Sequence, residues 1–275
     1  MENENLSTDQ LIKFALNEKD EDLSWDYIRI LHKKGNQEVF EAAKDLCESN
    51  ESEKVTLGAD ILGQLGFDFE SNNFPFREQS LPILLKISET EKDIGALQSI
   101  VFALGRMNDE KATQRIFELK DHKHEDIRFA VVHGLLTIDE IDAIKAMIKL
   151  SADSDEAVRN WAAFGLGSQI EIDTEEIRNA LFARVGEKGN EVCDEIRGEA
   201  LVGLAVRKDE RVIEPLLKEL SSESVGKLSV EAASETGDAR LCNSLLNLKD
   251  WWDVDTELLN EAIKNCCKNL QNVSS

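Results

Sequence analysis

One short pattern occurs three times in the chain, and it constrains the fold more than any other feature of the sequence. The segments DIRFAVVHGLLT (126–137), AVRNWAAFGLGS (157–168) and EIRGEALVGLAV (195–206) each place an arginine shortly before two apolar residues and a Gly-Leu pair. Apolar residues three, four and seven positions after the arginine lie on one face of a helix. Each segment is therefore predicted to be a helix that buries this face.

The arginine serves as position zero for aligning further copies of the pattern. Four more segments fit the same offsets, so we expect seven landmark helices with position zero at Tyr27, Gly58, Leu97, Arg128, Arg159, Arg197 and Gly226. Successive positions are 29 to 39 residues apart. A repeat of this length is typical of a solenoid of helical hairpins.

A second amphipathic helix is expected between successive landmark helices. The predicted segments are 39–47, 80–88, 112–119, 142–150, 176–185 and 212–220. Two intervals are longer because the segments 66–76 and 185–194 extend the connecting loops. The predicted fold class is all-α, a right-handed α-solenoid (α-α superhelix) of about seven or eight hairpins.

The segment IRGEALVGLA (196–205), followed by KDERVIEPLLKEL (208–220), resembles HEAT repeats of the phycobilisome-lyase type. In that family an Asp-containing turn leads from each landmark helix to the next unit, and the corresponding acids here are Asp109, Asp139, Asp209 and Asp238. The resemblance implies a single array over residues 1–275, with divergent repeats in 1–66, the best matches in 67–249 and a cap in 250–275. It implies little about function, because HEAT arrays serve unrelated tasks.

The arginines at position zero are predicted to be structural rather than catalytic. The methylene chains of Arg128, Arg159 and Arg197 can cover the packed helices while each guanidinium reaches a loop carboxylate. Gly or Ala six positions further on lets neighbouring backbones approach closely.

The side of the landmark helices formed by positions +2, +5 and +9 is predicted to line the concave surface, where solenoid proteins usually bind. Phe102, His133 and Phe164 are expected to form one ridge there, with Trp161 beside it, and exposed aromatic patches mark interaction sites. An inner seam of the core is the alternative for this ridge. The candidate partner-binding residues are Asp60, Phe102, Arg106, His133, Trp161, Phe164, Glu199 and Glu231.

The acidic composition limits the choice of partner. The chain has 55 Asp and Glu residues against 32 Lys and Arg residues, a formal net charge of −23. Repulsion from phosphates opposes binding to nucleic acids and to anionic membranes. A protein partner with a basic surface is expected, although solubility alone would also explain the acidity.

The cysteines and the first residues predict a cytoplasmic protein. The five cysteines, at positions 47, 193, 242, 266 and 267, are odd in number and form no C-x-x-C motif. We therefore expect buried, reduced thiols rather than a disulfide framework or a zinc site. The opening MENENLSTDQ is polar and acidic, unlike a signal peptide, and no apolar run approaches the ~20 residues that a membrane span needs.

Motifs that would indicate an enzyme are weak. The His124-Glu125 pair resembles the metal-binding pairs of HEAT-type deoxyhypusine hydroxylases, which need several such pairs for a di-iron centre. Trp161 and Asp60 are reminiscent of HEAT-like DNA glycosylases, but the basic track along phosphates is missing. No catalytic residue, metal site or cofactor is predicted.

The sequence therefore favours a non-catalytic protein-binding scaffold or adaptor with an acidic, partly aromatic concave surface. Two alternatives stay open. One is an immunity or inhibitor protein that neutralises a basic partner, and the other is an enzyme of the lyase or DNA-glycosylase type that uses the same groove. Trp251 and Trp252 are predicted to close the C-terminal end of the array.

Overall fold

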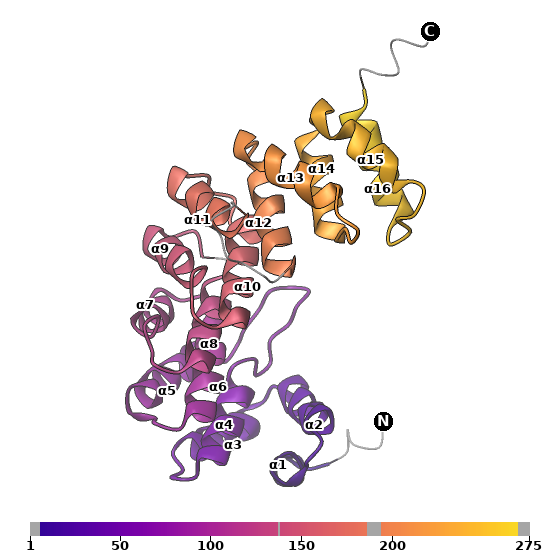
Figure 1. Cartoon of the computed structure of the whole chain (residues 1–275). Coiled ribbons are helices and arrows are strands. Elements are labelled where there is room, and N and C mark those ends of the chain that lie inside the picture. Colours follow the sequence, from indigo (N-terminus) through magenta and orange to yellow (C-terminus); the bar gives the residue numbers. More distant parts are fainter. Residues whose placement is uncertain (1–5, 137, 186–193, 269–275) are drawn as a thin grey trace. The chain divides into compact units, whose positions relative to one another are not determined.

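The computed structural model describes residues 6–136, 138–185 and 194–268, and within these residues all regular secondary structure is helical (Figure 1). A single antiparallel bridge joins Asp68 and Asn73 in a loop. The helices pair in sequence into eight hairpins, from α1 with α2 to α15 with α16. The predicted all-α solenoid is confirmed. None of the helices in this part of the chain has the length and hydropathy that a membrane crossing requires.

The chain divides into two compact units, residues 1–135 and 136–275. The first unit contains α1 (Thr8–Asn17), α2 (Glu21–Lys34), α3 (Gln37–Cys47), α4 (Ser52–Leu62), α5 (Arg77–Thr90), α6 (Ile94–Gly105), α7 (Glu110–Glu118) and α8 (Glu125–Leu135). The landmark helix α6 packs between α4 and α8, and the second helix α5 packs between α3 and α7. Two rows of helices result.

The second unit repeats this arrangement. It contains α9 (Ile141–Leu150), α10 (Glu156–Phe164), a π-helix (Gly165–Gln169), α11 (Glu175–Val185), α12 (Asp194–Val206), α13 (Ile213–Leu220), α14 (Lys227–Thr236), α15 (Cys242–Leu248) and α16 (Thr256–Cys266). Short 3₁₀ turns, Glu210–Val212 and Ala239–Leu241, lead into α13 and α15. Here the landmark helices α10, α12 and α14 are neighbours, and α16 extends their row.

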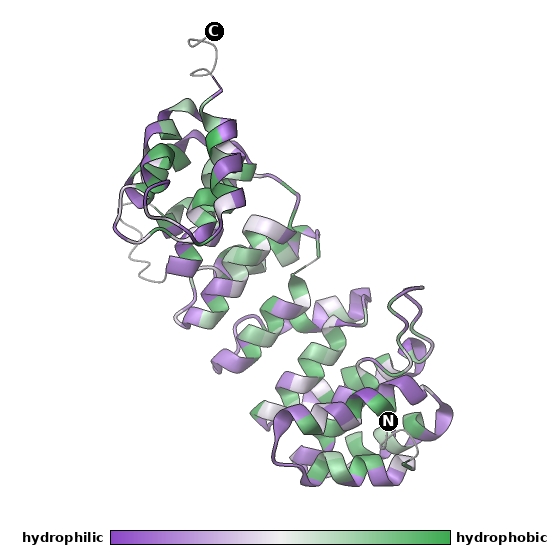
Figure 2. Ribbon diagram, turned by 90° about the vertical axis from the view of Figure 1, so that its right-hand side faces the viewer, coloured by the Kyte–Doolittle hydropathy of each residue, from purple (hydrophilic) through white to green (hydrophobic). Residues whose placement is uncertain are grey.

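The predicted buried face is confirmed for the landmark helices from α4 to α14, but in α2 the residues at +3 and +7, Ile30 and Lys34, are only half-buried. Each helix carries hydrophobic and hydrophilic residues on the same ribbon (Figure 2). The residues at +3, +4 and +7 of α4, α6, α8, α10 and α12 are all buried: Ile61, Leu62, Leu65, Ile100, Val101, Leu104, Val131, Val132, Leu135, Ala162, Ala163, Leu166, Ala200, Leu201 and Leu204. Burial of this apolar stripe explains why the pattern recurs along the chain.

Three of the four aspartates in the short turns cap the N-terminus of the helix or 3₁₀ turn that follows. The side chain of Asp109 accepts a hydrogen bond from the backbone N–H of Lys111, and Asp209 and Asp238 do the same at the 3₁₀ turns before α13 and α15. Such caps satisfy backbone donors that a helix leaves unpaired at its first turn. Asp139 lies one residue before Glu140, the N-cap position of α9.

Two of the arginines at position zero, Arg128 and Arg159, tie their landmark helices to the preceding loop. Arg128 donates from Nη1 to the carbonyl of His122 at 2.9 Å, and Arg159 donates to the carbonyl of Asp153 at 3.0 Å. Arg197 does reach a carboxylate, but on a helix rather than the predicted loop: its Nε lies 3.2 Å from Oε1 of Glu219 on α13. A structural role fits all three contacts.

The cysteine prediction is wrong for one pair. Cys242 and Cys267 form a disulfide with an S–S distance of 2.01 Å, which links the first residue of α15 to the residue after α16. Their separation of 25 residues matches no motif that sequence reading recognises. Cys47 and Cys266 are free and buried as expected, and Cys193 lies outside the described residues.

The two C-terminal tryptophans take different roles. Trp252 is buried and donates from Nε1 to the carbonyl of Val225 at 2.7 Å, so it ties the segment between α15 and α16 to the residues just before α14. Trp251 is 48% exposed and leaves part of its ring at the surface.

Neighbouring landmark helices are in backbone contact at pairs of glycine residues. A Cβ added at Gly203 on α12 would lie 2.5 Å from the Cα of Gly167, and one added at Gly105 would lie 2.8 Å from the Cα of Gly134. These distances leave no room for a side chain, because the obstructing atoms are backbone.

Replacing Gly203 with Ala is therefore expected to lower the free energy of unfolding by about 1–3 kcal/mol, the usual cost of overpacking. The matched control is Gly95→Ala on α6, where the added Cβ meets only the side chain of Asp93 at 3.4 Å. Urea denaturation of both variants measures the difference. Equal stability of the two variants would contradict close helix contact at Gly203.

Candidate partner-binding site

The eight predicted site residues fall into two groups of four, one in each unit. The side of the landmark helices formed by positions +2, +5 and +9, counted from position zero, is called the inner face. The unit-1 cluster comprises Asp60, Phe102, Arg106 and His133, on α4, α6 and α8. The unit-2 cluster comprises Trp161, Phe164, Glu199 and Glu231, on α10, α12 and α14.

The aromatic rings of the unit-1 cluster pack on one another. The ring centroid of Phe102 lies 5.6 Å from that of His133, so this part of the expected ridge is present. Phe129, which sequence analysis did not select, lies 4.6 Å from His133 and 6.2 Å from Phe102. All three rings are half-buried in edge-on or tilted contacts, the arrangement that aromatic pairs prefer.

Asp60 is the buried charge of the unit-1 cluster, with 9% of its surface exposed. Burial raises the pKa of its carboxyl to about 6, although a hydrogen bond from Ser99 and the positive charge of Arg106 act in the opposite direction. The backbone carbonyl of Asp60 accepts a hydrogen bond from Nε2 of His32 at 2.9 Å. Burial also lowers the pKa values of His32 and His133, so both imidazoles favour the neutral form.

The unit-2 cluster is more open to solvent. Trp161, with 36% of its surface exposed, meets Phe164 edge to face with ring centroids 5.6 Å apart. Together with Asn160, Glu195 and Glu199, the two rings line a cavity of about 190 Å³. Sequence analysis missed Asn160 and Glu195. Glu195 could have been found from its spacing, since it lies one helical turn before Glu199.

Glu199 is the most perturbed carboxyl of this cavity. It is half-buried, and its Oε2 accepts a hydrogen bond from the hydroxyl of Ser168 at 3.3 Å. Burial raises the pKa of Glu199, and the neighbouring carboxylates of Glu231 and Glu195 raise it further. Glu195 and Glu231 therefore both repel the carboxylate of Glu199, and a bound cation would relieve that repulsion.

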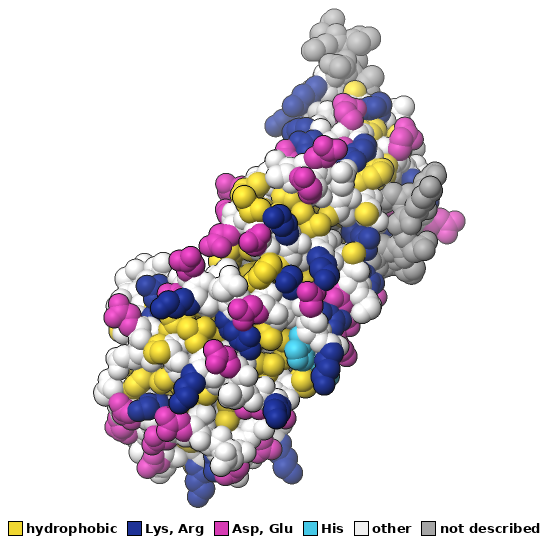
Figure 3. Space-filling model, turned by 90° about the vertical axis from the view of Figure 1, so that its left-hand side faces the viewer, with side chains coloured by type: hydrophobic (Ala, Val, Ile, Leu, Met, Phe, Trp, Pro, Cys, Tyr) yellow, Lys and Arg dark blue, Asp and Glu magenta, His cyan; other side chains and the backbone are white. Residues whose placement is uncertain are grey.

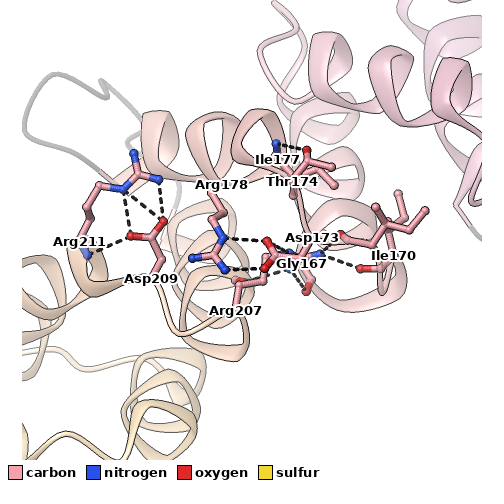
Figure 4. Close-up of polar contacts among 11 residues, drawn as sticks. Gly167, Ile170, Asp173, Thr174, Ile177, Arg178, Arg207, Asp209 and Arg211 are labelled. Atoms are coloured by element: carbon pink, nitrogen blue, oxygen red, sulfur yellow. Dashed lines mark hydrogen bonds and ion pairs between the residues drawn. The ribbon is translucent and has the colours of Figure 1, made fainter.

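A buried arginine fixes the backbone of the π-helix that follows α10 (Figure 4). Arg207, 8% exposed, donates to the carbonyl oxygens of Gly167 at 3.1 Å, Gly203 at 3.0 Å and Ile170 at 2.7 Å. These bonds hold the π-helix against α12 and so position Ser168 over Glu199. Sequence analysis missed Arg207, because carbonyl partners leave no signal in the sequence.

Two further ion pairs surround Arg207 in Figure 4. Asp173 lies 3.8 Å from Nε of Arg207 and also accepts a hydrogen bond from Nε of Arg178 at 2.7 Å. Asp209 accepts three hydrogen bonds from the guanidinium of Arg211, at 2.9 Å, 3.2 Å and 2.6 Å, and one from its backbone N–H at 3.0 Å. These contacts brace the loop between the π-helix and α11 and the turn after α12.

A larger cavity of about 450 Å³ lies beside the N-terminal ends of α12 and α14. Its charged lining residues are Asp194, Glu195, Arg197, Lys218, Glu219 and Lys227. Acids and bases are balanced there, so this cavity favours neither a cationic nor an anionic ligand.

No group of three or more His, Cys, Asp and Glu side chains in the described part of the chain is placed to hold a metal ion. Nδ1 of His124 lies 3.4 Å from the carboxylate of Asp126 at the start of α8, and its contact with Glu125 is longer, at 3.9 Å. Elsewhere, basic and acidic side chains are interspersed over the face that Figure 3 shows. A surface of mixed sign gives no second candidate site.

The buried carboxyl of Asp60 predicts a pH-dependent stability. Its pKa is about 6 in the folded protein and 3.8 ordinarily, so the folded state binds the proton more tightly. The contribution of Asp60 is fully present below pH 4 and is lost as the pH rises through 6. The free energy of unfolding of Asp60→Asn, measured relative to that of the unmodified protein, should therefore rise by up to about 3 kcal/mol between pH 4 and pH 7.5.

Urea denaturation of both proteins at several pH values measures this difference. The control is Asp45→Asn, at an exposed position of α3 in the same unit. A difference between Asp60→Asn and the unmodified protein that stays constant from pH 4 to pH 7.5 would rule out the raised pKa.

Arg207 predicts a large loss of stability on substitution. Arg207→Met removes the buried guanidinium that donates to four carbonyl groups, those of Gly167, Ile170, Ile172 and Gly203, and hydrogen bonds to charged groups contribute about 1.5–3 kcal/mol each. We expect a total loss of about 3–5 kcal/mol. Arg29→Met, which removes an ion pair with Asp26 in which both side chains are 57% exposed, should cost at most about 1 kcal/mol. Chemical denaturation compares the two, and similar losses would show that Arg207 holds no essential backbone.

The chain resembles known proteins over most of its length. Residues 81–167 match the family of HEAT repeats. The protein YibA of Escherichia coli K12 is 27% identical over 241 residues, which cover 86% of this chain and 82% of YibA. YibA of Escherichia coli O157:H7 matches to the same extent.

Solved structures agree with these matches. The crystal structure of Escherichia coli YibA has a TM-score of 0.77 at 25% identity, and the match covers 98% of this chain and 95% of that chain. An engineered protein with a TM-score of 0.50 and 18% identity, matched over 95% of this chain and 77% of its own, shares the fold alone. Neither finding supports the finer resemblance to the phycobilisome-lyase type. The comparisons thus show that residues 81–167 match the HEAT-repeat family and that the chain is similar to YibA over most of its length.

Proposed function

We propose that the chain is a non-catalytic scaffold that binds a protein with a basic surface on its inner face. The observation that carries this proposal is the unit-2 cluster. Partly exposed Trp161 and half-buried Phe164 lie beside the carboxylates of Glu195 and Glu199, with Glu231 close enough to raise the pKa of Glu199.

Aromatic and acidic groups contribute differently to such binding. Tryptophan side chains are among the residues that contribute most to the free energy of protein association, because their large rings lose water on contact. The net charge of −23 attracts a basic partner over a distance and raises the rate of encounter. The HEAT fold supports the proposal, since stacked hairpins offer extended binding surfaces.

A scaffold and an inhibitor would use the same surface. An immunity or inhibitor protein is the special case in which the bound partner loses its own activity. No observation favours a lyase or a DNA glycosylase over these binding functions. Assaying the partner with and without the chain separates a scaffold from an inhibitor.

Affinity capture from the native lysate tests the proposal. The unmodified protein should retain a basic protein at low salt and release it at about 0.5 M salt, because screening weakens the attraction between exposed charges. The double variant Trp161→Ala/Glu199→Gln should lose most of the captured protein while keeping its helical circular dichroism.

The matched control is Trp251→Ala/Glu214→Gln, which removes the same two residue types from exposed positions elsewhere in the second unit. This control should capture the partner as the unmodified protein does. Capture that resists salt and is equal for both double variants would refute the proposal.

A further inference from the structure

The geometry points to a specific occupant for the cavity of the unit-2 cluster: the guanidinium group of an arginine side chain supplied by the partner. This inference rests on the proposed function and names the chemistry of its contact. This cavity is lined by Asn160, Trp161, Phe164, Glu195 and Glu199. We call it the cation cage.

The size of the cation cage suits one side chain. Its volume is about 190 Å³, whereas pockets that enclose drug-sized ligands usually measure ~300–1,000 Å³. The exposed Glu195 and the partly exposed Trp161 leave it open to solvent. A side chain projecting from a protein surface can therefore enter without a conformational change of the chain.

The charge of the cation cage selects a cation. Two of its five lining residues are carboxylates, and none of the five is Lys or Arg. Glu231 adds a third negative charge nearby, since it raises the pKa of Glu199. An anionic ligand would meet repulsion from all three, whereas a cation would be attracted by each.

The aromatic and polar walls favour guanidinium over ammonium. Trp161 and Phe164 meet at 86°, so two ring systems in different orientations border the same space. A planar guanidinium stacks on such rings and can bind a carboxylate through two parallel hydrogen bonds, which an ammonium cannot do. Oδ1 of Asn160 is buried and has no hydrogen-bond partner among the described residues, so it offers a further acceptor at the wall.

The walls of the cation cage are held in place before any ligand arrives. Ser168 fixes Glu199, and Arg207 fixes the π-helix that carries Ser168. The close contact of Gly167 with Gly203 sets the spacing between this segment and α12. Groups that are already ordered lose little entropy on binding, which favours recognition of a single side chain.

A titration with small probes tests the cation cage without any partner protein. The full chain is titrated with N-acetyl-arginine methylamide while the indole N–H signal of Trp161, assigned through Trp161→Phe, is followed by NMR. We expect saturable binding in the millimolar range. The neutral N-acetyl-citrulline methylamide, which has nearly the same shape, should leave the signal unchanged, and N-acetyl-lysine methylamide should bind more weakly than the arginine probe.

Variants identify where the probe binds. Glu199→Gln should weaken binding of the arginine probe about fivefold, whereas Glu214→Gln, which removes an equal charge from α13 in the same unit, should leave it unchanged. Absence of saturation, equal binding of the citrulline probe, or an affinity that Glu199→Gln does not alter would overturn the inference. Equal affinity for the lysine probe would overturn the assignment to guanidinium.

The probe titration tests the cation cage, and the affinity capture tests the proposed scaffold function, so a negative result in one does not decide the other. Probe binding without a captured partner would contradict the scaffold but leave the cation cage intact. A captured partner whose retention depends on Trp161, without binding of the arginine probe, would support the scaffold and overturn the cation cage.

Discussion

Backbone contact between neighbouring landmark helices is the constraint on which the rest of the structure depends. Gly105 and Gly134 meet in the first unit, and Gly167 and Gly203 meet in the second, at distances that exclude any side chain. Because the helices approach this closely, residues at +3, +4 and +7 lose contact with water, and those at +2 and +5 are directed to the inner face. Stability and the position of the site therefore follow from the same glycines.

The periodicity of apolar residues predicts the helices and their buried faces, because both depend on spacing within one short segment. The apolar residues of AVRNWAAFGLGS (157–168) identify both the helix and its buried face, since spacing along one helix fixes which side chains point the same way. Contacts between residues far apart in the sequence cannot be predicted in this way. Arg207 binds the carbonyl groups of Gly167 and Ile170, and every residue has a carbonyl, so composition gives no sign of this contact.

The same limit explains the errors and omissions. The bond between Cys242 and Cys267 depends on how α15 and α16 pack, and their spacing along the chain does not reveal it. Asn160 becomes part of the cation cage because α10 packs against α12, a contact that the repeat predicts only in outline. Tertiary packing, which a linear pattern does not encode, decides which of the many acids of this chain become neighbours.

The two clusters differ in charge, and under the proposed function a basic partner would bind most strongly where the chain supplies no cation of its own. Position +9 holds Arg106 in the first unit, where its positive charge acts on the buried carboxyl of Asp60. The same position holds Ser168 in the second unit, and this neutral hydroxyl leaves the charge of Glu199 uncompensated. A cation from another molecule would compete with Arg106 in the unit-1 cluster, but in the unit-2 cluster it would supply the missing positive charge.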